Sequence, residues 1–394
     1  MSMIRKLLLV LVSTACLLPT AGCWNAKEVN DLAIITGAGI DLTEDGRIEL
    51  SVEIYLTSPG GTESDGPMTG QPNGDKGTSV IRTVHGINMA DAASRLQKMI
   101  SRKVFWGQAE VFLFGERMAR AGLEEPMDFM LRHTASRERS QVFVANGPAK
   151  DVLLLTPPVD RSLSDALVSM AEQQTGLNIT MKELAQMMVG KSRAAVLPIV
   201  HIYPEKDLQD AFPYIAGMAV IKEGRMIGKL DEYTTRGVMW LRNEMKHATV
   251  TVKPDESGGY VSLHLLRNHT RLIPSIQGDR WIMTVRITGQ DDIVENTSNL
   301  DLSEPDHLEQ VEREMERFVE ERVKLALDTA QKKLKVDIFG FADAFWRRYP
   351  KQWMANASRW DEIFPEMEVR LETDIRIARP GLIGKNFFPR QEQR

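Results

Sequence analysis

The chain has 394 residues, of which 43% are hydrophobic and 26% are charged, as is usual for globular proteins with room for two or three domains. Its formal net charge is -5, and the sequence contains no block of clustered lysine and arginine. Because phosphate binding needs such clusters, these features argue against nucleic acid as a partner.

The first 22 residues have the layout of a lipoprotein-type signal peptide. Arg5 and Lys6 precede an apolar run at 7–18, and small residues then lead to Cys23. This order is typical of exported proteins, and the run is shorter than the about 20 residues of a membrane-spanning helix. Cleavage before Cys23 would free a thiol for diacylglycerol, whose two acyl chains hold a protein stably at a membrane. We therefore predict that residues 1–22 are removed and that Cys23 is lipidated.

Three alternatives to this interpretation stay open. Cys16 also follows small residues and is a rival lipidation site, although its apolar stretch would be only about six residues long, shorter than a usual signal core. Cys16 and Cys23 could instead form a disulfide, although Cys16 lies in the segment expected to be removed. The apolar run could also remain uncleaved as an anchor. Thr20, preceded by Pro19, stands where such signals usually carry leucine.

Residues 31–42 are expected to form a buried strand that runs into a turn, and residues 46–58 a strand, because Ile48 to Leu56 alternate with polar residues. Residues 59–77 contain six glycines and three prolines without apolar periodicity, which indicates a long flexible excursion. The elements expected next are a strand at 78–86, a helix at 88–100, a strand pair or one bent strand at 103–116, a helix at 117–134, a strand at 140–147, and helices at 148–155, 162–174 and 180–189.

The second half of the sequence is rich in predicted strands. Residues 194–213 are punctuated by proline and indicate a boundary, after which 214–231 reads as a hairpin. The elements expected after it are strands at 247–253, 260–276 and 280–295, one long amphipathic helix at 303–336 with Ser303 as its N-cap, and a last strand at 366–379. We therefore predict an N-terminal α+β domain at 23–205, a C-terminal α+β domain at 206–385 with a subdivision near 300 left open, and a tail at 386–394.

The sequence offers no constellation of catalytic or metal-binding residues. Gly37 and Gly39 follow a strand, but another strand comes after them, so we interpret them as a turn between sheet strands and not as a dinucleotide site. Gly190 does not complete a phosphate loop, and Lys191 and Arg193 are expected at a solvated helix end. The seven histidines form neither H-x-H nor H-E-x-x-H. We assign no catalytic residue, no cofactor and no metal.

Aromatic residues recur every seven positions near the C-terminus, at Phe339, Trp346, Trp353 and Trp360. Because Pro350 prevents one continuous helix, we expect two short helices, the second beginning at Pro350. The tryptophan rings are expected to pack on the sheet or on the long helix. The alternative is that Trp346, Trp353 and Trp360 form a partner surface.

Three segments together resemble the Ger(x)C family of spore germination lipoproteins, the C subunits of nutrient germinant receptors. They are GCWNAKEVNDLAIITGAGID at 22–41, GMAVIKEGRMIGKLDEYTTRGVMWL at 217–241 and FWRRYPKQWMANASRWDEIFPEMEV at 345–369. Asn25 stands where the family usually has aspartate. The resemblance implies a multidomain α+β fold of mixed β-sheets flanked by helices.

The same resemblance implies a non-enzymatic protein on the outer face of the spore inner membrane, held there by a diacylglycerol anchor. It would work beside two integral membrane receptor subunits, an A-type and a transporter-like B-type, in germination in response to nutrients. The alternative from another class is a lipid-anchored solute-binding protein of a nutrient uptake system. That alternative would need two lobes of alternating βα order, which the strand-rich second half does not indicate.

Overall fold

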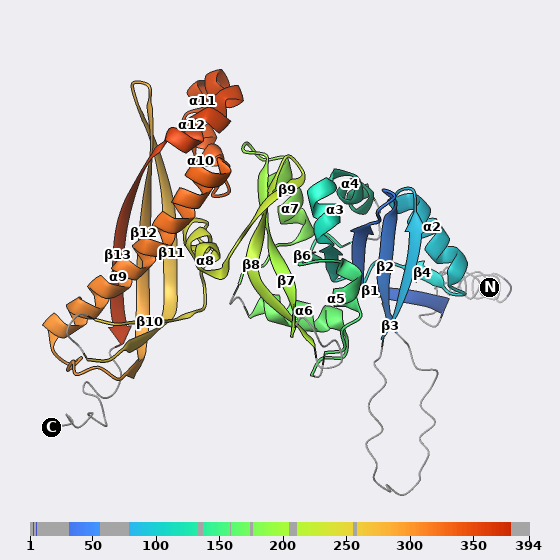
Figure 1. Ribbon diagram of the computed structural model, residues 1–394, viewed down its shortest axis with the longest axis horizontal. Helices are drawn as coiled ribbons and strands as arrows, with labels where there is room; N and C mark the ends of the chain where they lie inside the picture. Colours follow the sequence, from blue (N-terminus) through green and yellow to red (C-terminus); the bar gives the residue numbers. More distant parts are fainter. Residues whose placement is uncertain are drawn as a thin grey trace, which may run out of the picture.

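The computed structural model describes residues 31–55, 79–132, 137–157, 159–173, 176–204, 211–254 and 258–379, together with Met3 and Arg5. Cys16, Cys23, the 59–77 excursion and the 386–394 tail lie outside the described residues. Two β-sheets with flanking helices lie side by side in an elongated molecule (Figure 1). Both sheets mix parallel and antiparallel pairs, which confirms the predicted α+β class. Within the described ranges, no helix is both long and apolar enough to span a membrane.

The first sheet has nine strands in the order β3-β2-β1-β5-β6-β7-β8-β9, with β4 paired to the start of β1. Strands β1, β5, β6 and β7 run parallel, while β2 and β3 on one side and β8 and β9 on the other run antiparallel to their neighbours. The bounds are β1 (Leu32–Leu42), β2 (Ile48–Tyr55), β3 (Ser79–Gly86), β4 (Lys103–Phe105), β5 (Val111–Phe114), β6 (Gln141–Ala145), β7 (Ala194–Tyr203), β8 (Phe212–Lys222) and β9 (Arg225–Leu230).

Six helices accompany this sheet: α2 (Met89–Met99), α3 (Glu116–Ala121), α4 (Glu124–Arg132), α5 (Ala149–Leu153), α6 (Leu163–Glu172) and α7 (Met181–Met188). The helix expected at 117–134 is divided in two because Gly122 adopts a φ of 145°. Buried carboxylates on the strands fix two of these helices. Asp41 accepts hydrogen bonds from the N–H groups of Ala149 and Lys150, and Glu53 accepts them at the start of α6.

Gly37 and Gly39 lie inside β1, so the predicted glycine turn is wrong. A Cβ atom on Gly37 would lie 2.2 Å from the Oγ of Ser164, and one on Gly39 would lie 2.9 Å from a methyl group of Leu153. Helices α5 and α6 therefore pack directly against the backbone of β1. Glycine within a strand commonly marks such a close approach.

Most of the segment at 194–213, where a boundary was predicted, is strand β7. Pro198 lies within β7, where the pairing with β8 is irregular. The predicted hairpin is present as β8 and β9, and its turn holds Glu223 and Gly224 at positive φ. This hairpin extends the first sheet across the predicted division at 205/206. The domain limits themselves stay a prediction.

The second sheet has the order β10-β11-β12-β13, with β12 and β13 parallel and the other pairs antiparallel. Its strands are β10 (Thr249–Val252), β11 (Val261–Gln277), β12 (Arg280–Asn296) and β13 (Glu368–Arg379), and α8 (Glu232–Leu241) connects the two sheets. Gly237 lets α8 approach the long helix that follows β12, since a Cβ atom there would lie 2.1 Å from the carbonyl oxygen of Arg322.

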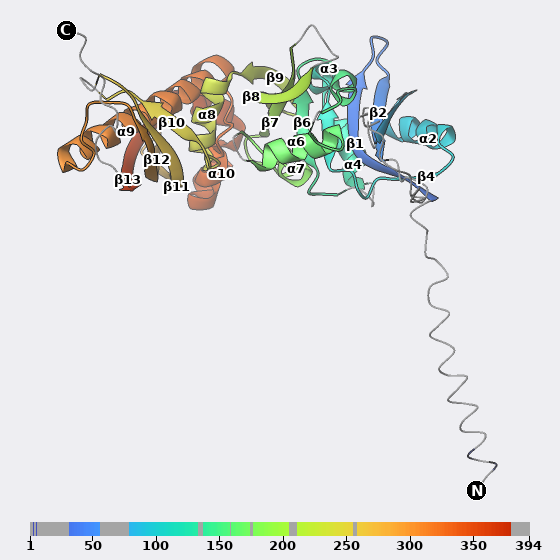
Figure 2. The ribbon, with the colours of Figure 1, turned by 90° about the horizontal axis from the view of Figure 1, so that it is seen from below.

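The predicted long amphipathic helix is α9 (Pro305–Asp328), which continues as a π-helical turn, η3 (Thr329–Leu334). It lies along the second sheet in both views (Figure 1, Figure 2) and buries Val311 and Met315. Ser303 is not its N-cap, because Pro305 occupies the first helical position and Glu304 precedes it. Glu312 and Glu316 accept hydrogen bonds from N–H groups of β13, so α9 covers the free edge of the sheet.

Candidate partner-binding surface

Three short helices follow η3 and carry the predicted tryptophans: α10 (Phe341–Arg348), α11 (Pro350–Asn356) and α12 (Trp360–Glu366), with a 3-10 turn, η4 (Ala357–Arg359), before the last. Pro350 begins α11, as predicted, whereas α12 was not anticipated. The carboxylate of Asp337 accepts hydrogen bonds from the backbone N–H groups of residues 339–342, with N···O distances of 2.7–3.2 Å. These bonds stabilise the start of α10. Burial raises the pKa of Asp337, and these N–H groups oppose the rise.

An aromatic cluster fixes these helices to the β11–β12 hairpin. The ring of Trp281 on β12 lies 4.7 Å from that of Phe345 and 6.0 Å from that of Trp360, measured between centroids. Trp353 lies 4.9 Å from Trp360. Trp353 and Trp360 are buried, and the ring of Trp360 contacts Trp281 of the sheet, whereas Trp346 is 42% exposed. Of the three predicted partner-surface residues, only Trp346 therefore presents its ring to solvent.

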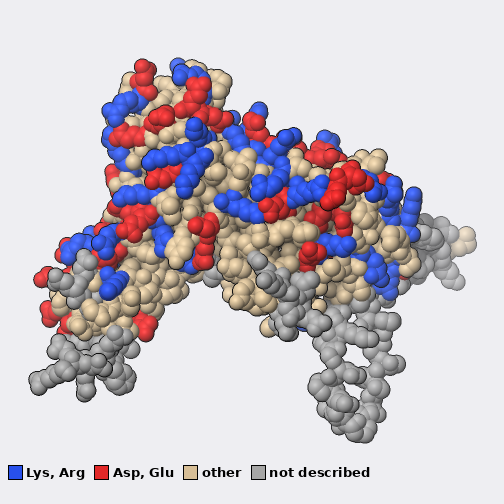
Figure 3. Space-filling view, viewed as in Figure 1, with Lys and Arg blue, Asp and Glu red and all other residues tan. Residues whose placement is uncertain are grey.

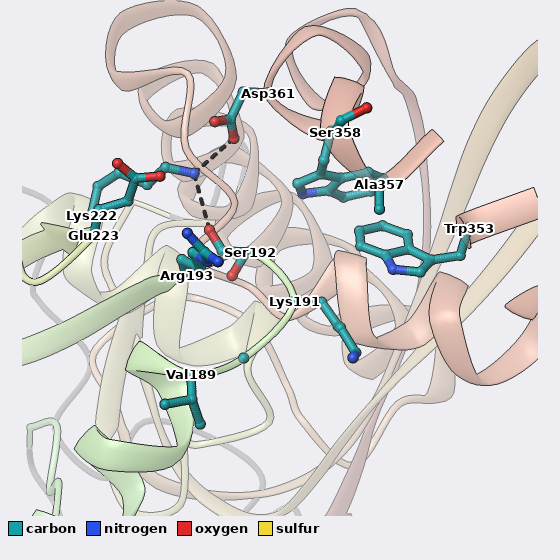
Figure 4. Close-up of a pocket in the computed structure, with 12 residues that line it drawn as sticks. Val189, Lys191, Ser192, Arg193, Lys222, Glu223, Trp353, Ala357, Ser358 and Asp361 are labelled. Carbon is teal, nitrogen blue, oxygen red and sulfur yellow. Dashed lines mark hydrogen bonds and ion pairs between the residues drawn. The ribbon is translucent and has the colours of Figure 1, made fainter. Parts of the chain in front are cut away.

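A cleft of ≈ 540 Å³ lies where the aromatic helices meet the first sheet (Figure 4). One wall is the loop at 189–193, between α7 and β7, together with the end of β8 at Lys222 and Glu223. The other wall comes from α11, η4 and α12. The residues of that second wall are Trp353, Ala357, Ser358, Trp360 and Asp361.

Polar contacts hold the two walls together. The ammonium group of Lys222 donates to Oδ1 of Asp361 at 2.7 Å and to the carbonyl oxygen of Ser192 at 3.0 Å (Figure 4). The ammonium group of Lys191 lies 4.4 Å from the ring centre of Trp346, close enough for a cation–π contact. The contacts to Asp361 and Trp346 join residues that are more than a hundred positions apart in the sequence.

Arg242 provides a second set of contacts between the same two parts of the molecule. The guanidinium of Arg242, which follows α8, donates to the carbonyl oxygen of Ile338 at 3.0 Å. It also contacts the sulfur of Met187 at 3.4 Å and pairs with Glu244. Arg242 thus connects α7 of the first sheet with the segment that leads into α10.

Lysine and arginine side chains gather across the middle of the molecule where the two sheets meet (Figure 3). At the cleft, Lys191, Arg193 and Lys222 bring three positive charges, against Glu223 and Asp361. Arg193 is exposed, and its guanidinium has no hydrogen bond or ion pair with another described residue. We predicted Lys191 and Arg193 at a solvated helix end and did not predict their position at this junction. Local sequence patterns do not show which distant segment these residues face.

The cleft also contains an unsatisfied donor. Trp360 is 3% exposed, and its indole N–H has no acceptor among the described residues. Most buried donors are paired, so an unpaired N–H group at the wall of the cleft is unusual. In the part of the chain that the structure describes, no group of three or more histidine, cysteine, aspartate or glutamate side chains is placed to hold a metal ion.

Comparison with known proteins places most of the chain, residues 25–202 and 216–381, in one family. Residues 25–202 match the model of the spore germination protein N-terminal domain, and residues 216–381 match that of the spore germination B3/GerAC-like C-terminal domain. The chain is 26% identical over 403 residues to spore germination protein KC of Bacillus subtilis (strain 168), covering 96% of this chain and 97% of that protein. It is 22% identical over 388 residues to spore germination protein B3 of the same organism, covering 94% and 96%.

A solved structure shares the fold. The crystal structure of the GerBC protein superposes with a TM-score of 0.58 at 18% identity, covering 87% of this chain and 97% of that one. The first family model ends at residue 202, within β7, and the second begins at residue 216, within β8. The chain belongs to the Ger(x)C family of spore germination proteins.

Proposed function

We propose that this chain is a non-enzymatic, lipid-anchored subunit of a spore nutrient germinant receptor, required for germination in response to nutrients. The observation that carries the proposal is similarity to spore germination proteins over nearly the full length of both chains. The relatives' names supply the biological process. The signal-like layout of residues 1–22 supports the anchor at Cys23, and the family resemblance implies the position on the outer face of the spore inner membrane.

The fold favours a rigid scaffold over a capture protein. Solute-binding proteins close two lobes of alternating βα units around a ligand. Here the second sheet consists of a long hairpin, one short strand and one parallel strand, with α9 along it. Such a body is suited to holding or coupling two integral membrane subunits, an A-type and a transporter-like B-type, while the nutrient binds elsewhere.

Lipidation would raise the concentration of the chain at the membrane. An anchor keeps the chain on the same membrane surface as the membrane subunits. Its loss therefore sharply lowers the effective concentration of the chain near those subunits. We expect deletion of the gene to abolish germination by this receptor while spores still form. Complementation with the wild-type gene should restore germination, and complementation with Cys23→Ala should restore much less.

The competing function is a solute-binding protein of an uptake system. Titration calorimetry of the purified chain against a panel of amino acids and sugars separates the two. The receptor-subunit proposal predicts no tight binding. Small-molecule sites set a few polar groups in a mainly apolar cleft, whereas charged side chains make up much of the lining of the cleft described above. Micromolar affinity for any single nutrient would favour the solute-binding protein.

A further inference from the structure

We propose that the cleft between loop 189–193 and helices α11 and α12 binds a carboxylate-bearing segment of a partner protein. The inference rests on the proposed function only in taking the ligand to be part of a protein partner. Its chemistry comes from the charges and the unsatisfied donor at the cleft.

The cleft is positive within a chain of net charge -5. Lys222 is already paired with Asp361, which shows that this wall accommodates a carboxylate at 2.7 Å from an ammonium group. Lys191 and Arg193 stay exposed, and Arg193 keeps its charge without an acidic partner among the described residues. An incoming carboxylate would find an unpaired guanidinium, which binds such groups through two parallel N–H donors.

The unpaired indole N–H of Trp360 points to the same ligand chemistry. It is a donor without an acceptor, and Trp360 lines the cleft. A donor left unpaired in a buried position destabilises the free protein. The indole nitrogen is closed off from solvent, so a carboxylate oxygen would reach it and remove that cost only through a small shift of the wall. A carboxylate would supply both an acceptor for the indole and a negative charge for Arg193.

The size of the cleft indicates a segment of protein and not an isolated ion. Its ≈ 540 Å³ far exceeds the about 30 Å³ that one water molecule occupies. Val189, which is 84% exposed, lines the cleft and offers apolar contact. Trp346, beside Lys191 but outside the lining, is 42% exposed. We infer an acidic segment with an aliphatic residue among its carboxylates.

A lipid surface fits the cleft less well. Recognition of anionic lipids uses clusters of about four to eight lysines and arginines on an accessible surface. This site is concave and has only three cations among its lining residues, fewer than such a cluster. The observations therefore favour a protein segment.

The test is fluorescence anisotropy with the full chain in detergent micelles and a fluorescein-labelled peptide of sequence EDLED, compared with QNLQN. EDLED should bind and QNLQN should not, and the affinity should fall as salt is raised. Arg193→Gln and Lys191→Gln should each weaken EDLED binding at least about fivefold, because each removes one charge facing the ligand. Lys332→Gln is the matched control, since its side chain is 73% exposed on η3 and pairs with Asp328.

Trp360→Phe removes the indole donor and keeps an aromatic ring, and it should weaken EDLED binding. Circular dichroism should show that the melting temperature of this variant stays close to that of the wild type. Equal binding of QNLQN, or unchanged affinity in Arg193→Gln, would overturn the proposal. Sedimentation with phosphatidylglycerol vesicles that depends on Arg193, without peptide binding, would overturn it in favour of a lipid surface. None of these results concerns germination, so a failed peptide test and a failed deletion test remain distinct.

Discussion

The buried carboxyl group of Asp291 allows a pH-dependent test of the second sheet. Asp291 lies on β12, between Leu265 of β11 and Ile377 of β13 in the pairing register. Its exposed fraction is 0%, and neither carboxylate oxygen has a hydrogen-bond partner among the described residues. Burial, with a smaller contribution from the charge of Asp292, raises the pKa of Asp291 to about 7.

The sign of the effect follows from linkage. Between pH 3.8 and 7 the unfolded chain loses the proton of Asp291 while the folded chain keeps it, so the stability contributed by the protonated group falls as the pH rises. The difference between about 7 and 3.8, at 1.36 kcal/mol per pKa unit, amounts to about 4 kcal/mol at pH 8. Asp291→Asn removes this ionisation and retains the shape of the side chain.

We therefore expect the variant to match the wild type near pH 4 and to be more stable by up to about 4 kcal/mol at pH 8. Urea unfolding, followed by the fluorescence of Trp281 and the neighbouring tryptophans, measures the difference at each pH. Asp279→Asn, at an exposed position in the β11–β12 turn, is the control and should leave the pH profile unchanged. A stability difference that does not vary with pH, or a variant less stable than the wild type at pH 8, would refute the reasoning.

Three further predictions concern packing, the excursion and the anchor. Gly237→Ala should destabilise the chain by about 2–3 kcal/mol in urea, because the added Cβ meets a backbone oxygen of α9; Gly176→Ala, whose Cβ would have its nearest neighbour at 3.9 Å, should change little. Replacing residues 59–77 by a short Gly-Ser linker should leave the melting temperature within a few degrees, since loop closure costs grow slowly with length, and a drop of about ten degrees would show that the segment packs. Radiolabelled palmitate should label the wild type and not Cys23→Ala; labelling of the variant, for example at Cys16, would contradict the assignment.

Local patterns predicted most of the elements. The alternation at 46–58 corresponds to β2, and the turn between β8 and β9 matches its glycine signal. Pro350 marks the start of α11, because proline suits the first helical position. These features depend on residues close in sequence, which is why one sequence is enough to find them.

Sheet membership could not be predicted in the same way. The hairpin at 214–231 looks the same whether it opens a new sheet or extends an old one, and only its pairing with β7 decides. Gly37 and Gly39 suggest a turn until Ser164 and Leu153 are known to pack against them. The cleft is a stronger case, since Lys222 and Asp361 are 139 residues apart and no periodicity links them.

The central claim is that this chain works as part of a receptor in the spore membrane. Affinity purification of the tagged, full-length chain from detergent-solubilised spore membranes, followed by mass spectrometry, tests it most directly. The account predicts that two multi-spanning receptor subunits, an A-type and a transporter-like B-type, co-purify with the wild type and are much reduced with Cys23→Ala. Recovery of a permease with an ATPase in their place would contradict the account.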